Sequence, residues 1–125
     1  MKVEIIGKGG LENKEIVEFI DDISKKIGIA TTDAILEIVF VSEDEIRKLN
    51  STFRKINKET DVLSFPQISI NGNIPIFGSI VICEKIGKDR GETTEELLSH
   101  GFLHLTGYDH ETNQSKWDEI EAKIT

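Results

Sequence analysis

Residues 34–41 (AILEIVFV) impose the strongest constraint on how this chain can fold. They are rich in β-branched residues, and apolar side chains fall on both sides of the extended segment. A strand that is apolar on both faces is typical of the interior of a sheet that is covered above and below. We therefore predict a sheet that has this strand near its centre and helices packed against it.

The spacing of apolar residues predicts the helices. Apolar residues recur three and four positions apart through Leu11–Ile27, which indicates an amphipathic helix stopped by Gly28. Two further helices begin at capping boxes, in which a Ser or Thr precedes a Glu by three residues. The boxes are Ser42 with Glu45, whose helix would bury Ile46 and Leu49, and Thr93 with Glu96, whose helix would end at Gly107. A last helix is expected over Ser115–Ile124.

Short apolar runs predict the remaining strands, at Lys2–Ile6, Asp61–Phe65 and Ser79–Cys83. Asn71-Gly72 predicts a hairpin turn between arms at residues 68–70 and 74–76. Asn50–Thr60 is polar and is expected to be a connection, and Glu84–Gly91 a charged loop with room for a short helix. Mixed strands and helices fit the α+β or α/β classes, and we predict α+β: one domain over residues 1–125, with a small mixed sheet packed with helices.

Charge limits the partners that this chain can bind without specificity. Its 15 basic and 23 acidic residues give a net charge of −8, which argues against broad coating of nucleic acid or membrane but leaves room for a local basic cleft. Basic residues do cluster twice, and on sequence alone two solvated loop faces are the favoured interpretation. The clusters are Lys48, Arg54, Lys55 and Lys58, and then Lys85, Lys88 and Arg90.

The sequence favours a cytoplasmic protein without a membrane span. No signal peptide is evident in the alternating start Met1–Ile6, and no segment approaches the roughly 18 apolar residues of a span. Cys83 is the single cysteine, so an intrachain disulfide is excluded. It lies in an apolar run, which favours a buried residue over a nucleophile.

All three histidines of the chain fall within residues 100–110. His100 and His104 are four residues apart on the predicted helix, so both imidazoles project from one face and can reach one metal ion. Gly107 permits a turn that brings His110 to the same point. Three histidines with water in a fourth, open position are typical of catalytic zinc at the end of a helix. Imidazole ligands also suit Ni, Cu or Fe, so the residues alone leave the metal open.

The same spacing matches the metzincin protease motif, with one decisive departure. That motif has a glutamate directly after its first histidine, where it serves as general base. Here the position is Gly101, which cannot accept a proton, so peptide hydrolysis is disfavoured.

The segment Ser99–His110 (SHGFLHLTGYDH) closely resembles the YbeY family. Three further segments are similar to that family's motifs, in the same order along the chain. They are Asn50–Arg54 (Asn-x-x-x-Arg), Thr60–Pro66 (TDVLSFP) and Gly78–Cys83, where the family's Gly-Asp-Ile-Val-Ile-Cys appears with Ser79 in place of the aspartate. If that aspartate normally supports the site, its role here is lost or filled elsewhere.

The resemblance implies a zinc-dependent endoribonuclease that cleaves single-stranded RNA. It implies action in ribosomal RNA maturation, at the 3′ end of the small-subunit RNA, and in ribosome quality control, with rRNA on the ribosome and ribosomal or assembly-factor proteins as partners. Carried over by position, the metal ligands are His100, His104 and His110, and Arg54 is the basic residue of the catalytic cleft. His100 and Arg54 are thus the predicted catalytic residues.

Two other functions compete with this one. The first is a metal-dependent hydrolase of another class, a peptidase or a phosphoesterase, and the second is a non-catalytic ribosome-assembly factor with a structural zinc. The general base also stays open. Asp109 could serve, or it could orient a ligand imidazole, and the 2′-hydroxyl of the substrate could itself be the nucleophile.

Overall fold

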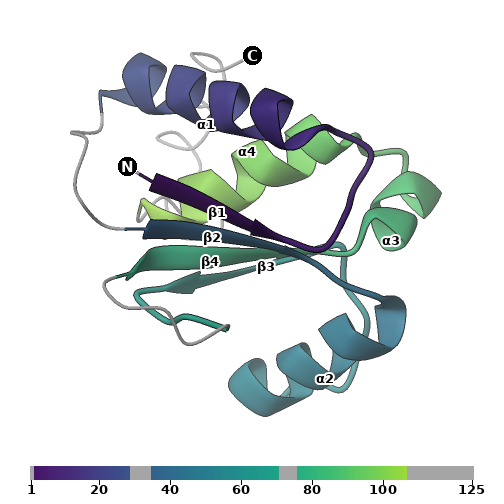
Figure 1. Ribbon diagram of the computed structural model, residues 1–125. Helices are drawn as coiled ribbons and strands as arrows, with labels where there is room; N and C mark the ends of the chain where they lie inside the picture. The colour runs from purple at the N-terminus through teal and green to yellow at the C-terminus, as the bar shows by residue number, and fades with distance from the viewer. Residues whose placement is uncertain (1, 29–34, 71–75, 107–125) are drawn as a thin grey trace.

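The computed structural model describes residues 2–28, 35–70 and 76–106, which form a four-stranded mixed sheet with helices on both faces (Figure 1). The strands are β1 (Lys2–Ile6), β2 (Ile35–Phe40), β3 (Val62–Pro66) and β4 (Ile76–Ile82). Their order across the sheet is β1-β2-β4-β3. β1, β2 and β4 are parallel, and β3 pairs antiparallel with β4. The predicted mixed sheet is confirmed, with β2 in its interior.

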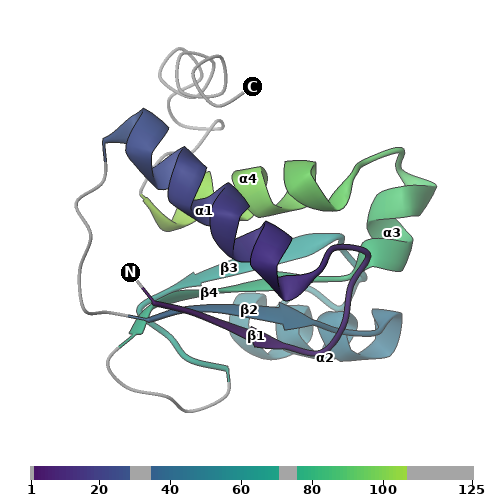
Figure 2. The ribbon, with the colours of Figure 1, turned by 45° about the horizontal axis from the view of Figure 1, so that its top comes forward.

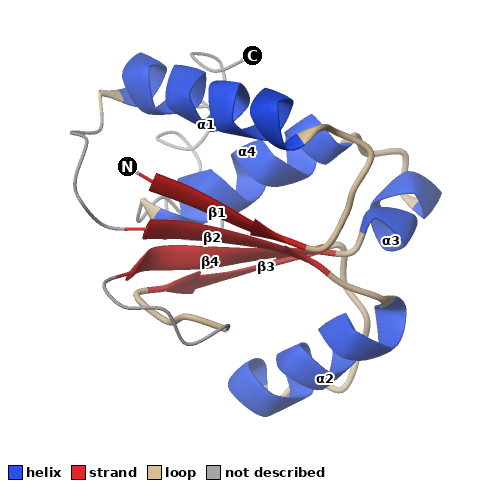
Figure 3. Cartoon of the chain, viewed as in Figure 1, coloured by secondary structure: helices blue, strands red, loops and turns tan. Residues whose placement is uncertain are grey.

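The helices divide between the two faces of the sheet. α1 (Asn13–Ile27) and α4 (Thr94–Leu105) cover one face, which we call the α4 face. α2 (Glu43–Arg54) covers the opposite face, which we call the α2 face, and the short α3 (Glu84–Asp89) lies at one end (Figures 2 and 3). The sheet therefore separates α4 from α2.

Alternation along the strands fills a separate apolar core on each face. The core of the α4 face includes Leu36, Ile38, Ile80, Ile82 and Phe102, all fully buried. The core of the α2 face includes Val39, Ile46, Leu63, Phe65, Val81 and Cys83. Cys83 is 1% exposed, which confirms the prediction of a buried thiol. Ile46 is fully buried and Leu49 partly so, as expected.

Local signals set the helix ends largely as predicted. Both predicted capping boxes are present, and in each the hydroxyl of the N-cap residue accepts from the backbone N–H three residues on. Gly28 ends α1 with a φ of 73°, a left-handed conformation that glycine adopts without strain. The short helix expected within Glu84–Gly91 is present as α3.

The prediction of a connection from Asn50 onward is wrong for its first residues. α2 continues to Arg54 and ends at Lys55, which has a left-handed φ of 59°. Asn50 is 3% exposed, and its side-chain amide donates to the carbonyl of Lys58 at 2.9 Å. The burial of Asn50 is therefore accompanied by a hydrogen bond that joins the turn at Lys58 to α2.

The predicted hairpin arm at residues 68–70 is also wrong. These residues are not a strand, and the antiparallel pair is instead formed by β3 and β4, with Phe65 opposite Ser79. The Asn71-Gly72 turn, the Gly107 helix end and the Ser115–Ile124 helix lie outside the described residues. No helix in the described ranges has the length and apolarity needed to cross a membrane.

Candidate active site

The two histidines of α4 lie with their ring nitrogens facing each other. His100 Nε2 is 3.1 Å from His104 Nε2, and the ring centroids are 4.7 Å apart. Both side chains are half-buried at the flank of the helix. The predicted convergence of these two imidazoles is confirmed, whereas His110, the third predicted ligand, lies outside the described residues.

The spacing of these nitrogens fits a shared metal ion. Two ligands at about 2.0–2.1 Å from a tetrahedral zinc lie roughly 3.3 Å apart, close to the 3.1 Å seen here. The same separation suits one N–H···N hydrogen bond between neutral rings. Within residues 2–28, 35–70 and 76–106, no three His, Cys, Asp or Glu side chains come together as a metal site. Two of the three predicted ligands therefore lie side by side, and the third lies outside the described residues.

Close packing under α4 fixes the position of this histidine pair. Gly101 faces the sheet, and a Cβ on this residue would lie 2.6 Å from Ile80 Cγ2. The carbonyl of Gly101 accepts a hydrogen bond from Ser64 Oγ in β3 at 3.0 Å. Gly78 in β4 is equally tight, because a Cβ there would lie 2.7 Å from Leu105 Cδ2. Glycine at these two points lets helix and sheet approach closely.

The packing gives a steric reason why a protease-like base is missing. A side chain at position 101 would enter the buried layer between α4 and β4, away from the flank that carries His100. A glutamate there would have to bury its carboxylate among apolar atoms. The metzincin base is therefore missing for two reasons. Glycine has no side chain, and a side chain at this position would point into the buried layer and away from the histidines.

Arg54 lies on the other side of the sheet from the histidines. It is exposed in the last turn of α2, and it makes no ion pair with any residue in the described part of the chain. β3 is the edge strand between the two positions, since Ser64 contacts α4 while Phe65 packs into the core of the α2 face. A substrate that touches both Arg54 and the histidines would therefore have to pass around this edge.

Ser79, the departure from the family motif, is fully buried and also lies on the α2 face. Its hydroxyl is 2.8 Å from Glu37 Oε1 and 2.7 Å from the carbonyl of Ile68. Glu37 is its register partner in β2 and is fully buried as well. The Glu37 carboxylate also accepts from the Ser69 hydroxyl at 3.1 Å and the Ile70 N–H at 2.8 Å. A carboxylate is thus supplied next to position 79 by the neighbouring strand.

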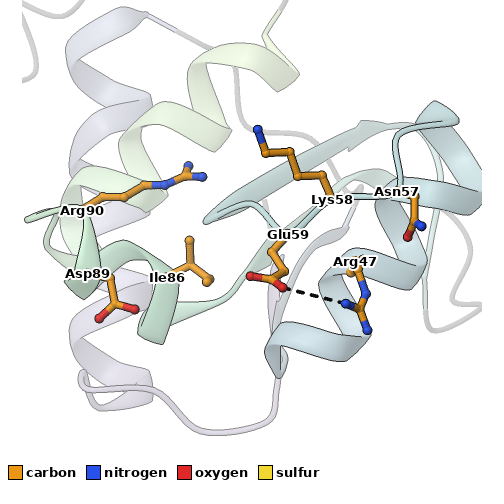
Figure 4. A pocket seen from close by; sticks show the side chains of 7 residues that line it. All are labelled: Arg47, Asn57, Lys58, Glu59, Ile86, Asp89 and Arg90. Atoms are coloured by element: carbon orange, nitrogen blue, oxygen red, sulfur yellow. Dashed lines mark ion pairs between the residues drawn. The ribbon is translucent and has the colours of Figure 1, made fainter.

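The two predicted basic clusters meet at one pocket of about 430 Å³ (Figure 4). Lys58 comes from the first cluster and Arg90 from the second, with Asn57, Ile86 and Asp89 completing the wall beside an ion pair. The ion pair joins Arg47 Nη1 to Glu59 Oε1 at 3.8 Å. The clusters are therefore neighbours in space, although each contributes to a surface that also carries acidic groups.

Beside this pocket, Asp61 forms a hydrogen bond with Glu92 and an ion pair with Arg90. Burial raises the pKa of the Asp61 carboxyl, but a hydrogen bond with Glu92 and the nearby Arg90 charge outweigh burial and hold that pKa below its usual value. Arg90 Nη1 is 3.3 Å from Asp61 Oδ1. The same hydrogen bond to Asp61, with burial and repulsion added, raises the pKa of Glu92 to about 7. The hydrogen bond between them therefore favours the ionised form of Asp61 and the protonated form of Glu92.

Two residues of this region escaped the sequence analysis. Phe53 is 46% exposed and leans against Phe65, with ring centroids 5.0 Å apart. Glu37 looked like an isolated charge in an apolar strand. A signal existed for both: an aromatic residue directly before Arg54 in the first basic cluster, and an acid inside a strand that is otherwise apolar on both faces.

Comparison with known proteins agrees with the motifs and the fold. The family model described as Endoribonuclease YbeY matches residues 8–124. Proteins named Endoribonuclease YbeY from Sulfurimonas denitrificans and Nautilia profundicola are 37% and 39% identical, and each alignment covers 90% of this chain and 86% of the relative. A solution structure of a Thermotoga maritima protein is 29% identical with a TM-score of 0.55, covering 98% of this chain and 86% of that one. The chain therefore belongs to the YbeY endoribonuclease family.

Proposed function

We propose that this protein is a zinc-dependent endoribonuclease that cleaves single-stranded segments of ribosomal RNA. Its role would be maturation of the 3′ end of small-subunit rRNA and ribosome quality control, with residues 1–125 acting as one YbeY-like hydrolase domain. Family membership supports hydrolytic endoribonuclease activity and RNA as the substrate. The zinc, its ligands and the ribosomal partners are the parts of this proposal that go further.

The facing imidazoles of His100 and His104 are the observation that carries the proposal. Their nitrogen separation of 3.1 Å suits a shared ion, and the packing of Gly101 against Ile80 holds the helix that bears them. His110 is the proposed third ligand. When bound, the zinc would polarise the scissile phosphate and lower the pKa of a coordinated water.

The protein's own residues would perform the remaining tasks. Arg54 would pair with the phosphate oxygens and offset the negative charge that develops on them, because a guanidinium binds phosphate through two parallel hydrogen bonds. Ser64 would keep α4 in place through its bond to the Gly101 carbonyl. The general base is unassigned, with Asp109 as one candidate. The nucleophile is either a water molecule or the 2′-hydroxyl of the substrate, and product ends distinguish these two: a 2′,3′-cyclic phosphate identifies the 2′-hydroxyl as nucleophile.

The first test combines elemental analysis with RNA cleavage by the parent and by His104→Ala. We expect about one zinc per chain in the parent, because three histidines suffice for one tetrahedral site with an open position. We expect neither zinc nor cleavage in the variant. Zinc without cleavage of any RNA would favour the assembly-factor function, and a parent purified without chelators that holds no metal would remove the basis of the proposal.

A further inference from the structure

We infer that Phe53 is a stacking platform for one base of single-stranded RNA, and that the basic turn beside it binds the adjoining phosphates. This inference deepens the proposed function and rests on RNA being the substrate. Phe53 is 46% exposed at the end of α2, and its ring contacts that of the buried Phe65, with centroids 5.0 Å apart and ring planes tilted by 56°. An exposed aromatic ring that is packed against a buried neighbour suits base stacking, which is the usual way in which proteins bind unpaired bases.

The turn after α2 gives this ring cationic neighbours in fixed positions. Three backbone and side-chain bonds fold residues 55–58 onto the helix: Lys55 N to Ser51 O at 3.2 Å, Ile56 N to Asn50 O at 3.3 Å, and Asn50 Nδ2 to Lys58 O at 2.9 Å. The buried Asn50 thereby fixes the turn that carries Lys55 and Lys58. A basic turn with a fixed backbone loses less conformational entropy when it binds a phosphate chain than a flexible loop would.

Charge selects RNA over a protein partner as the occupant. The net charge of the chain is −8, yet residues 53–58 (FRKINK) contain three cations and no acid. Arg54 and Lys58 are exposed, and neither pairs with an acidic group among the described residues. Ile56 in the same turn is also 42% exposed and adds apolar surface there. An aromatic ring interleaved with unpaired cations is complementary to a polyanion that carries bases.

The position of Phe53 relative to the histidines suits one continuous RNA strand. Phe65, which supports Phe53, follows Ser64 in the edge strand β3, and Ser64 contacts the helix that carries His100 and His104. Successive residues of a strand point to opposite faces, so these two contacts mark the two sides of one edge. A single strand of RNA that crosses this edge would connect the platform to the site of cleavage.

The test measures binding of a short single-stranded RNA that carries 2-aminopurine, whose fluorescence is quenched on stacking. Stopped-flow mixing separates binding from any later cleavage. Phe53→Leu keeps the apolar bulk and should weaken binding about tenfold and abolish the quenching, because it removes one base–aromatic stack. Phe53→Trp should retain both, and duplex RNA should be insensitive to either change. Val17→Ala, a similarly exposed apolar residue of α1, is the matched control and should bind as the parent does.

The cations are tested through salt dependence. Lys58→Gln should reduce the slope of log Kd against log salt by about 0.7 for a single strand, whereas Lys14→Gln on α1 should leave it unchanged. Parent-like quenching by Phe53→Leu, or a Phe53→Trp variant that fails like Phe53→Leu, would overturn the inference. If the protein cleaves RNA and Phe53 has no effect, the inference alone fails. If Phe53-dependent quenching persists in a parent that cleaves nothing, the proposed function fails and the platform stands.

Discussion

The two faces of the sheet differ in how closely their helices pack and in which side chains they expose. On the α4 face, glycines at positions 78 and 101 bring helix and strands so close that neither position has room for a Cβ. On the α2 face, a helix ends in an exposed phenylalanine and a cationic turn, and a fully buried carboxylate lies under the sheet surface. The first face holds two imidazoles 3.1 Å apart, and the second carries an exposed ring beside cations. In the proposed function, the metal ligands and the RNA-binding surface therefore lie on different sides of one small sheet.

The largest effect is expected from Gly101→Glu, which recreates the glutamate of the metzincin motif. We expect loss of folding rather than peptidase activity, because the carboxylate would be buried against Ile80 without a partner. Circular dichroism and a peptide-cleavage assay measure the two outcomes. Folded protein with peptidase activity would contradict the distinction between the two faces.

A milder variant sharpens this prediction. Gly101→Ala should destabilise the protein by about 1–3 kcal/mol through overpacking, less the roughly 1 kcal/mol that alanine adds as a better helix former. Combining it with Ile80→Ala, which removes the clashing methyl group, should destabilise less than the sum of the two single changes. Chemical denaturation measures each free energy of unfolding.

Arg54→Ala should impair RNA cleavage through the α2 face and leave the zinc content unchanged. We expect cleavage to slow by about 10²–10³-fold, the usual loss when one charge-stabilising donor is removed, with zinc content unchanged. Arg47→Ala is the matched control on the same helix, because Arg47 already pairs with Asp44 at 2.8 Å. Parent-like cleavage by Arg54→Ala would show that a substrate does not cross the edge of β3 to reach this residue.

Removing the buried Glu37 carboxylate should lower the stability of the protein without changing its metal binding. Glu37→Ala removes the acceptor of the Ile70 N–H and one hydrogen bond each from the hydroxyls of Ser69 and Ser79, although Ser79 keeps the Ile68 carbonyl. The loss should cost about 1–3 kcal/mol of unfolding free energy. Zinc content should stay at the parent level because these groups lie across the sheet from α4.

Exchanging the two polar residues tests whether Glu37 stands in for the aspartate of the family motif. Glu37→Ser combined with Ser79→Asp moves the carboxylate to the neighbouring strand, where it can still accept from the same segment. The double variant should be more stable than Glu37→Ser alone. Equal stability of the two would indicate that the site at position 79 has no need of a carboxylate.

The smallest effect concerns pH. The pKa of Glu92 is raised from 4.5 to about 7, so its bound proton stabilises the folded state below pH 4.5, and this contribution is lost as pH rises toward 7. Solvent screening at this exposed side chain should keep the effect under about 1 kcal/mol, or a few degrees in Tm. Glu92→Gln should flatten the fall of Tm over this range, whereas Glu18→Gln on α1 should not. The lowered pKa of Asp61 acts in the opposite sense, and its contribution disappears only as pH falls through that pKa.

Sequence reasoning succeeded where the determinants are local. The capping boxes, the glycine after α1 and the i, i+4 histidine pair all depend on residues within one or two turns of each other. It failed where the determinants are distant. Residues 68–70 were expected to form a strand, but Ser69 and Ile70 bond to Glu37, more than thirty positions away in the chain.

The same reason explains the site. The predicted positions of His100 and His104 followed from helix geometry, whereas the place of Arg54 depended on which face of the sheet α2 would cover. The sequence offered an aromatic residue beside Arg54 as a signal for Phe53, but its exposure and its contact with Phe65 depend on the fold. A polar end to α2 looked like a loop because burial of Asn50 depends on the turn at Lys58.

The bond from Ser64 to the Gly101 carbonyl has a consequence for metal affinity. By joining the edge strand to the middle of α4, it resists rotation of that helix about its own axis, so the two imidazoles are oriented before any ion arrives. The conformational entropy of ordering the imidazoles is then lost during folding and does not reduce the affinity for an ion, which is the effect of preorganisation. Selectivity for one ion over another would accordingly depend on the rigidity of a helix and not on its ligands alone.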